Sequence, residues 1–264
     1  MATSESAPVR LNRHDSGKGP AVVLLHGLGL DHSLWDPQRE QLSTSFRVLA
    51  PDLRGHGATP APPGSTFSFP EFQADVIALL DELGIERAHM VGFSAGGFLA
   101  LRMAVHAPTR LESLTTIAAA PHCDAHTRAM GESWAESYRE GGYDAYALRL
   151  LKDLYYPDWI EDHLDVADQL RERKDVDLHG AIRWALAVGS FDLRGQLGRI
   201  RVPTLVLHGM DDRVVDPAHA RLLRQSITGA QLRLFAQTGH MVPVERPEET
   251  TQAIREFFEK VPSP

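Results

Sequence analysis

The sequence predicts an α/β fold with a mostly parallel central sheet and helices on both of its faces. Short apolar runs at 21–25 and 202–207 have the continuous hydrophobic character of strands covered on both sides. Segments with helical periodicity alternate with such runs, which is typical of parallel sheets. A third observation is a Gly-x-Ser-x-Gly turn at 92–96, placed between an expected strand and an expected helix.

Each strand is expected where a short apolar run ends in turn residues. We place strands at 9–13, 21–25, 46–50, 88–91, 114–118, 202–207 and 231–235. The first is the weakest, and the residues after it, 15–19, are typical of a turn. Helices with an apolar stripe are expected near 34–42, 68–84, 95–107, 217–225 and 247–258.

The helix near Ser68 has clear start and stop signals. Ser68 can cap its N-terminus, Pro70 lies in the first turn, and Glu71 completes a capping box. Apolar residues recur at helical spacing over 72–83, and Gly84 ends the helix.

The strand and helix alternation breaks between Pro121 and Leu193. This stretch has no strand signal and favours helices near 127–140, 143–154, 158–173 and 177–189. It holds all five tyrosines and three of the four tryptophans. A helical insertion after the strand that follows the Gly-x-Ser-x-Gly turn indicates a lid. We therefore expect a core domain, 1–121 and 194–264, and an inserted helical cap, 122–193.

Composition and charge restrict the class of protein. The 27 basic and 35 acidic residues give a net charge of −8 without a long basic run, which argues against nucleic-acid and membrane partners. The single cysteine, Cys123, excludes an intramolecular disulfide and fits a reducing compartment. Residues 1–8 lack the apolar core of a signal peptide, and no apolar run is long enough to span a bilayer. We expect a soluble, cytoplasmic protein.

Ser94 is the candidate nucleophile. A serine in this turn lies on a sharp strand-to-helix bend, and a Cβ at Gly92 or Gly96 would collide with neighbouring backbone. The helix N-terminus after Ser94 offers free N–H groups where a negative oxygen can develop. A plain glycine-rich turn is the alternative for the motif alone, so the context decides.

A serine hydroxyl needs a base to take its proton and an acid to orient that base. The expected order along the chain is Ser, Asp, His. Asp211 and Asp212 follow the strand at 202–207, and Gly239-His240 follows the strand at 231–235. Because functional groups gather at the carboxyl ends of strands in such sheets, we expect these segments to meet Ser94.

Five motifs in this order identify a family resemblance. They are His26-Gly27, Pro51-Asp52-Leu53-Arg54-Gly55-His56-Gly57, Gly92-Phe93-Ser94-Ala95-Gly96-Gly97, His208-Gly209-Met210-Asp211-Asp212 and Gly239-His240. With them the chain resembles an α/β-hydrolase from about residue 11 to residue 261. The stretch 26–35 is similar to the small carboxylesterases and the 3-oxoadipate enol-lactonase group.

The resemblance implies roles for individual residues. Ser94 is then the nucleophile and His240 the general base and acid. Asp212 is expected to orient His240, because the second aspartate of the pair matches the family's spacing; Asp211 and then Asp124 are the alternatives. This chemistry needs no cofactor and no metal.

The oxyanion hole is expected from the backbone N–H groups of Leu28 and Ala95. His26 and His56 are expected to hold loop backbone rather than to react, and Asp52 and Arg54 to brace the same loop.

The compact run 122–126 contains two histidines, Cys123 and Asp124, but its spacing does not favour a metal site. A pocket over Ser94 is expected to be lined by Trp134, Tyr138, Tyr155, Trp159, Cys123 and Met241. Aromatic side chains in a lid more often pack in its core than contact substrate, although some of them can do both.

The resemblance therefore implies a serine hydrolase that cleaves a carboxylic ester or lactone through an acyl-enzyme, and the aromatic side chains of the lid favour a small, largely apolar substrate. Three alternatives stay open: a C–C bond hydrolase of a ring-cleavage pathway, a perhydrolase, and a ligand receptor that keeps the triad with negligible turnover. Serine at position 94 argues against a dehalogenase or an epoxide hydrolase. The natural substrate and the oligomeric state are left open by the sequence.

Overall fold

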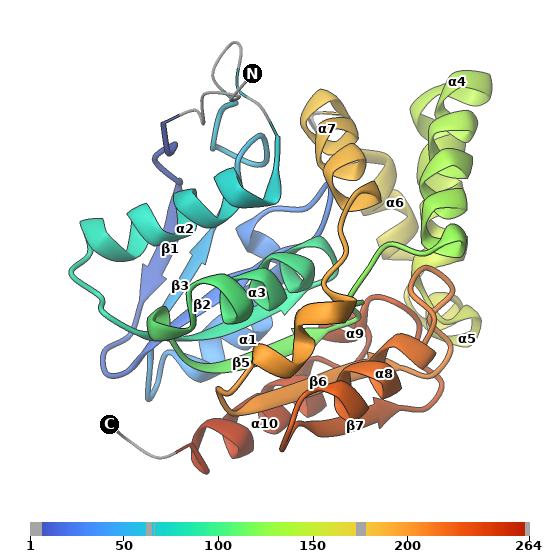
Figure 1. Ribbon diagram of the computed structural model, residues 1–264. Coiled ribbons are helices and arrows are strands. Elements are labelled where there is room, and N and C mark those ends of the chain that lie inside the picture. Colours follow the sequence, from blue (N-terminus) through green and yellow to red (C-terminus); the bar gives the residue numbers. More distant parts are fainter. Residues whose placement is uncertain (1–6, 62–64, 66, 173–177, 262–264) are drawn as a thin grey trace.

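Seven strands form one sheet in the computed structural model, which describes residues 7–61, 65, 67–172 and 178–261 (Figure 1). The strands are β1 (Arg13–Ser16), β2 (Ala21–Leu25), β3 (Arg47–Pro51), β4 (Ala88–Phe93), β5 (Leu111–Ile117), β6 (Thr204–Gly209) and β7 (Gln231–Phe235). Their order is β1-β3-β2-β4-β5-β6-β7, and only the β1–β3 pair is antiparallel. The predicted fold class is confirmed.

Helices cover both faces of this sheet, and the alternation of side chains along β2 shows it. Val23 and Leu25 belong to a buried apolar cluster that also contains residues of α2 (Phe69–Glu82), α3 (Ala95–His106) and α8 (Ala218–Ser226). Val22 and Leu24 pack instead with residues of α1 (Asp36–Leu42) and α10 (Pro247–Phe258). Because every side chain of the strand meets an apolar layer, the run 21–25 carries no polar residue.

The inserted stretch between β5 and β6 is helical, as predicted. It contains α4 (Ala125–Leu154), α5 (Pro157–Asp162), α6 (Asp165–Glu172) and α7 (Leu178–Gly189); α4, α6 and α7 lie toward the upper right of Figure 1, and α5 lies below them. Gly142, at φ 68°, interrupts the helical backbone of α4, close to the expected break after residue 140. α7 is anchored to the core through Trp184, whose ring stacks on Phe72 at 3.5 Å.

Several element boundaries differ from the prediction. The first strand is Arg13–Ser16 rather than 9–13, because its backbone pairs with β3 up to Ser16 and the turn starts only at Gly17, at φ 79°. One expected helix at 158–173 is two helices, α5 and α6, which are separated at His163; residues 173 and 177, the expected ends of two helices, lie outside the described residues.

The hydrogen bonding at the N-terminus of α2 also differs from the predicted capping box. Ser68 is the N-cap of α2, but its hydroxyl donates to the Glu71 carboxylate at 2.9 Å instead of accepting from a backbone N–H.

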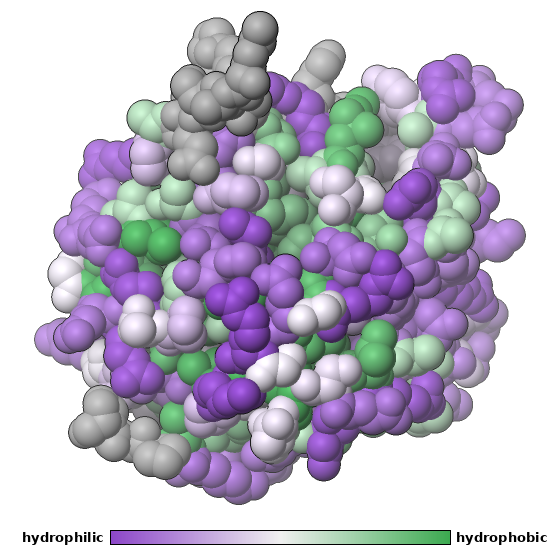
Figure 2. Space-filling model, viewed as in Figure 1, coloured by the Kyte–Doolittle hydropathy of each residue, from purple (hydrophilic) through white to green (hydrophobic). Residues whose placement is uncertain are grey.

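Polar and charged residues cover most of the molecular face in Figure 2, and apolar residues appear there in separate small patches. Among the described residues, exposed large apolar side chains include Tyr138 and Leu148 on α4 and Ile182 and Leu186 on α7. No helix in the described part of the chain has both the length and the apolar character needed to cross a membrane.

Candidate active site

Ser94 lies on the sharp turn between β4 and α3. Its backbone has φ 51° and ψ −120°, a strained conformation for a residue with a side chain. The turn closes only because its glycines allow it. A Cβ on Gly92 would meet the carbonyl of Gly96, and a Cβ on Gly96 would meet the carbonyls of Leu25 and His26. The expected collision with backbone at both glycines is therefore confirmed.

Gly97 lets α3 approach the sheet, and this contact gives a stability prediction. A Cβ on Gly97 would lie 2.5 Å from the Cβ of Ala119, so Gly97→Ala is expected to lower the free energy of unfolding by about 1–3 kcal/mol. Urea unfolding measures this loss. Gly131→Ala on α4 is the matched control, because nothing lies within 4 Å of the added methyl group.

The second substitution Ala119→Gly should restore most of the stability lost in Gly97→Ala, because it removes the colliding methyl group. Equal effects at Gly97 and Gly131, or no restoration in the double variant, would contradict this explanation of the packing.

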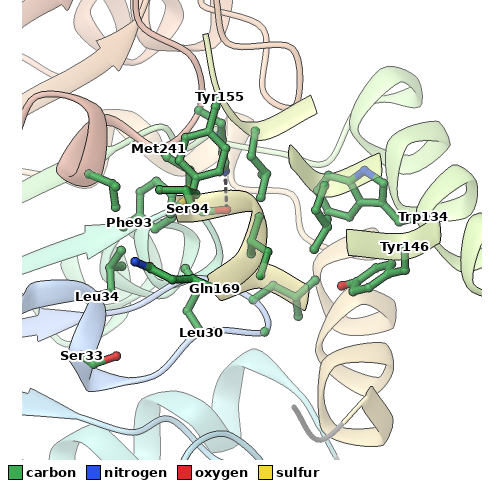
Figure 3. A pocket seen from close by; sticks show the side chains of 18 of the residues that line it. Leu30, Ser33, Leu34, Phe93, Ser94, Trp134, Tyr146, Tyr155, Gln169 and Met241 are labelled. Carbon is green, nitrogen blue, oxygen red and sulfur yellow. Dashed lines mark hydrogen bonds between the residues drawn. The ribbon is translucent and has the colours of Figure 1, made fainter. Parts of the chain in front are cut away.

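The structure brings Ser94, Asp212 and His240 together. His240 Nδ1 lies 2.8 Å from Asp212 Oδ2, and His240 Nε2 lies 3.0 Å from Ser94 Oγ, the contact drawn as a dashed line in Figure 3. A carboxylate only accepts hydrogen bonds, so Nδ1 carries the proton and Nε2 is left to accept from the serine hydroxyl. His240 is 2 % exposed and Asp212 6 %, which keeps bulk water away from both contacts.

Four donors surround the Asp212 carboxylate. Oδ1 accepts from the backbone N–H groups of Val214 and Val215, at 2.8 and 2.9 Å. Oδ2 lies close to His240 and, at 3.1 Å, to Nε2 of the fully buried His208. Burial alone would raise the pKa of Asp212, but His240 and His208 together hold this pKa well below its usual range. The carboxylate is thus charged at neutral pH.

The two alternative acids lie elsewhere. Asp211 has an exposed side chain, and its backbone N–H donates to the Thr238 carbonyl at 3.0 Å. Asp124 is the N-cap of α4: its Oδ1 accepts from the N–H of Thr127 and its Oδ2 pairs with His219 at 2.9 Å. Neither carboxylate has a hydrogen bond to His240 among those found in the described part of the chain.

The end of α4 holds the loop that carries His240. The backbone N–H groups of His240 and Met241 both donate to the Leu154 carbonyl, at 2.8 and 3.2 Å. The buried Glu245 carboxylate accepts from the N–H groups of Gly239 and Tyr156, each at 3.0 Å, and burial raises its pKa. The inserted helices and the histidine loop are therefore fixed to each other beside Ser94.

The expected oxyanion-hole residues flank Ser94. Ala95 is the first residue of α3, and the N–H groups of a first helical turn have no partner within the helix. Leu28 lines the cavity next to Ser94. The chain comes close here, since a Cβ on Gly27 would lie 3.1 Å from the Ser94 Cβ.

His26 and His56 hold the loop backbone, as expected. His26 Nδ1 lies 2.8 Å from the Gly27 carbonyl, and its Nε2 accepts from the Leu53 N–H at 2.9 Å. Burial lowers the pKa of His26 to about 3, so the ring is neutral, which fits one donor and one acceptor nitrogen. In the same way His56 contacts the Arg54 carbonyl and accepts from the N–H of Gly29.

Asp52 and Arg54 brace the same region. Arg54 donates from Nε and Nη2 to the buried Asp75 at 2.8 and 2.7 Å. Asp52 accepts from the N–H groups of His32 and Ala58 at 2.8 and 2.9 Å. Their expected role as structural residues is confirmed.

One group of three described residues, Asp31, His32 and Asp52, could offer ligand atoms to a metal ion. Asp52 is fully buried, however, and its two oxygens already accept from His32, Asn12 and Ala58. These hydrogen bonds account for the grouping without an ion. In the run 122–126, His126 contacts the Arg213 carbonyl and Asp124 contacts His219, so the two side chains are directed to different partners.

A cavity of about 330 Å³ opens over Ser94, between the core loops and helices α4 and α6 (Figure 3). It is lined by Leu28, Gly29, Leu30, Ser33, Leu34, Pro37, Phe93, Ser94, Trp134, Tyr143, Tyr146, Leu150, Leu154, Tyr155, Val166, Gln169, Leu170, His240, Met241, Val244 and Pro247. The lining is mostly apolar, which is typical of a small-molecule site.

Three of the six expected lining residues, Trp134, Tyr155 and Met241, lie in this cavity. The other three do not. Tyr138 is 42 % exposed, and Trp159 is stacked between Tyr155 and His163, at 5.1 and 3.9 Å. Cys123 is not among the residues that line the cavity, and its backbone N–H donates to the Phe191 carbonyl.

Sequence reasoning missed two kinds of residue. His208 lies in a recognised motif, but only the fold shows its ring beside Asp212. Tyr146 and Gln169 reach the cavity from α4 and α6, and their helical spacing alone does not show which face of each helix turns inward.

His208 gives a second prediction. Its Nε2 faces two acceptors, the Asp212 carboxylate and the Val215 carbonyl at 2.9 Å, so it carries a proton and donates. His208→Leu removes this donor, which should raise the pKa of Asp212 and move the acid limb of the pH–kcat/KM profile to higher pH, with activity about tenfold lower at neutral pH. His208→Gln keeps an N–H donor and should recover part of the loss. An unchanged acid limb in both variants would contradict this role.

Comparisons with known proteins agree with the observed fold. The family model described as alpha/beta hydrolase fold matches residues 20–247. The chain is 29% identical to 3-oxoadipate enol-lactonase 1 of Acinetobacter baylyi, covering 92% of this chain and 90% of that protein. It is 30% identical to a 2-hydroxy-6-oxo-2,4-heptadienoate hydrolase of Pseudomonas putida, covering 95% and 93%.

A crystal structure of the enol-lactonase from Burkholderia xenovorans superposes with a TM-score of 0.86 at 30% identity, covering 95% of this chain and 96% of that one. According to their names, these relatives cleave different kinds of bond. Similarity to them therefore does not show which kind of bond this chain cleaves.

Proposed function

The chain belongs to the alpha/beta hydrolase family, and from this premise we propose that it hydrolyses a small carboxylic ester or lactone through an acyl-enzyme on Ser94. One observation carries the proposal: the hydrogen-bonded series Ser94, His240 and Asp212 opens directly into a mostly apolar cavity.

In the acylation step, Ser94 Oγ attacks the ester carbonyl carbon while His240 Nε2 takes the hydroxyl proton. The carbonyl electron pair moves onto its oxygen, which the N–H groups of Leu28 and Ala95 stabilise. When the carbonyl re-forms, the bond to the alcohol oxygen breaks and that oxygen takes the proton from His240. The products are the free alcohol and an ester of Ser94. In a lactone the released hydroxyl stays attached to the acyl group.

In the deacylation step, a water molecule takes the place of the alcohol. His240 Nε2 accepts a proton from the water as its oxygen attacks the acyl carbon, and then returns the proton to Ser94 Oγ. The acid leaves and the serine is restored. Asp212 stays ionised throughout, because it stabilises the imidazolium that exists in both steps.

The strained backbone at Ser94 supports the same proposal. A positive φ at a serine costs of the order of 1–3 kcal/mol, and such strain clusters at functional sites. Here it directs the hydroxyl out of the sheet toward His240.

A C–C bond hydrolase is the second candidate, because the Pseudomonas putida relative is named for a dienoate substrate and its sequence covers 95% of this chain. Both candidates use the same three side chains, so the products distinguish them.

The test is a product analysis with three substrate sets: p-nitrophenyl esters of short acids, γ- and δ-lactones, and a 2-hydroxy-6-oxo-2,4-dienoate. We expect ester or lactone cleavage to the acid and the hydroxyl compound. Cleavage of the dienoate alone would select the C–C hydrolase. Tight binding with a raised melting temperature, but without turnover of any set, would select the receptor alternative.

A further inference from the structure

Helices α4 and α6 contribute several polar side chains to the wall of the cavity. These side chains differ in whether the protein itself supplies a hydrogen-bond partner. Trp134 Nε1 donates to Asp153 at 2.9 Å, the Tyr143 hydroxyl donates to the Leu170 carbonyl at 2.9 Å, and Gln169 Nε2 donates to Asp165 at 3.0 Å. These three groups are held in place by the protein itself. Trp134 and Tyr143 thereby use their only polar side-chain hydrogen, and Gln169 uses one of its two amide hydrogens.

The Tyr146 hydroxyl is different. Its side chain is largely buried and lines the cavity, and it has no hydrogen bond to any residue in the part of the chain that the structure describes. In Figure 3 its hydroxyl points inward from α4, across the cavity from Ser94. A polar O–H in an apolar cavity is costly unless a ligand or water accepts from it.

The Tyr146 hydroxyl is also suited to donate a hydrogen bond. Burial, with Tyr143 as its neighbour, raises the pKa of Tyr146 to about 12, so its proton stays on at all physiological pH values. Its ring packs against Tyr138 in an edge contact and against Tyr143 at a tilt, with centroids 6.2 and 6.0 Å away.

On the basis of the proposed function, we infer that the substrate carries an uncharged hydrogen-bond acceptor away from the scissile carbonyl, and that Tyr146 binds this acceptor and selects for it. Carbonyl, ether and hydroxyl oxygens have the required chemistry.

The charges around the cavity favour an uncharged group over a carboxylate. No lysine or arginine is among the described residues that line it. The charged side chains that bond to its wall include Asp153 and Asp165, and Arg149 is already paired with Asp153. A substrate carboxylate would lose its hydration there without gaining a cation, which is unfavourable.

The experiment uses isosteric substrate pairs. For the acyl side, p-nitrophenyl 4-oxopentanoate is compared with p-nitrophenyl pentanoate; for the alcohol side, 2-methoxyethyl acetate is compared with butyl acetate. In at least one pair, Tyr146→Phe should lower kcat/KM about tenfold for the member with the extra acceptor and leave its apolar partner nearly unchanged.

Tyr143→Phe is the matched control. It removes a hydroxyl that bonds the Leu170 carbonyl, so any loss should fall equally on both members of each pair. The p-nitrophenyl monoester of succinic acid tests the charge, and should be hydrolysed at least about tenfold less efficiently than the pentanoate.

Equal effects of Tyr146→Phe on both members of both pairs would overturn the inference. So would a preference of the wild type for the succinate monoester. Both results require an active enzyme. Absence of turnover of every ester and lactone would instead refute the proposed function, and this inference with it.

Discussion

Replacement of Ser94 by alanine is expected to abolish nearly all ester hydrolysis, with a loss of about 10⁴-fold or more in kcat/KM. The reason is that the Ser94 oxygen, 3.0 Å from His240 Nε2, is the only protein atom in the proposed mechanism that forms a bond to the substrate carbonyl carbon. Removal of this oxygen leaves His240 and Asp212 without a serine hydroxyl to activate. The measurement is the initial rate on the best p-nitrophenyl ester, with the unfolding curve of each variant beside it.

Ser33→Ala is the matched control for Ser94→Ala. Ser33 lines the same cavity, but its hydroxyl donates to Asp31 and not to His240. We expect it to keep activity within about threefold of the wild type. Similar losses in the two variants, or activity of Ser94→Ala near that of the wild type, would contradict the role of Ser94 as nucleophile.

Asp212→Asn is expected to lower kcat by about 10³- to 10⁴-fold. The amide that this substitution introduces still accepts through one oxygen, so the contacts with the N–H groups of Val214 and Val215 can persist and the protein should fold. What the variant lacks is the negative charge that holds the His240 proton on Nδ1 and stabilises the imidazolium. Because the pKa of Asp212 lies well below its usual range, the wild-type carboxylate is charged from about pH 5 to pH 8, so the two enzymes are compared across this range.

The alternative acids provide the controls. Asp211→Asn changes an exposed side chain, and Asp124→Asn keeps a residue that can cap α4. Both are expected to retain activity within about threefold of the wild type. A large loss in either one, together with a small loss in Asp212→Asn, would reassign the acid.

The sequence predicted the sheet well because its strands are buried on both faces. Runs such as 21–25 carry the signal in their own composition. β1 has no such signal: His14 and Asp15 are polar, and pairing with β3 decides where the strand begins and ends. An edge strand of this kind depends on its partner more than on its own residues.

The elbow was also predictable, since its five-residue motif is continuous in the sequence. Gly92 is needed by a contact within the turn, whereas Gly96 and Gly97 are needed by contacts with Leu25, His26 and Ala119 beside it. The meeting of Ser94 with His240, 146 residues apart, followed from a general property of parallel sheets, whose carboxyl ends share one edge.

The cavity lining was harder to predict, because it depends on how each inserted helix is rotated against the core. Trp159 and Tyr155 look equivalent in the sequence, yet Trp159 lies between two rings outside the cavity and Tyr155 lies inside it. Trp184 is one of the aromatic residues of the insertion, yet it packs in the core of the protein, where its Nε1 donates to the Arg54 carbonyl at 2.8 Å.

The most direct test of the central claim is covalent labelling of the wild type with an alkyl p-nitrophenyl phosphonate, which forms a stable analogue of the acylation intermediate. We expect release of p-nitrophenol in a one-to-one ratio with protein, loss of ester hydrolysis, and a phosphonyl group that peptide mapping places on Ser94. Unchanged ester hydrolysis with an unmodified Ser94, or a label on another residue that accounts for the lost activity, would contradict the serine hydrolase mechanism.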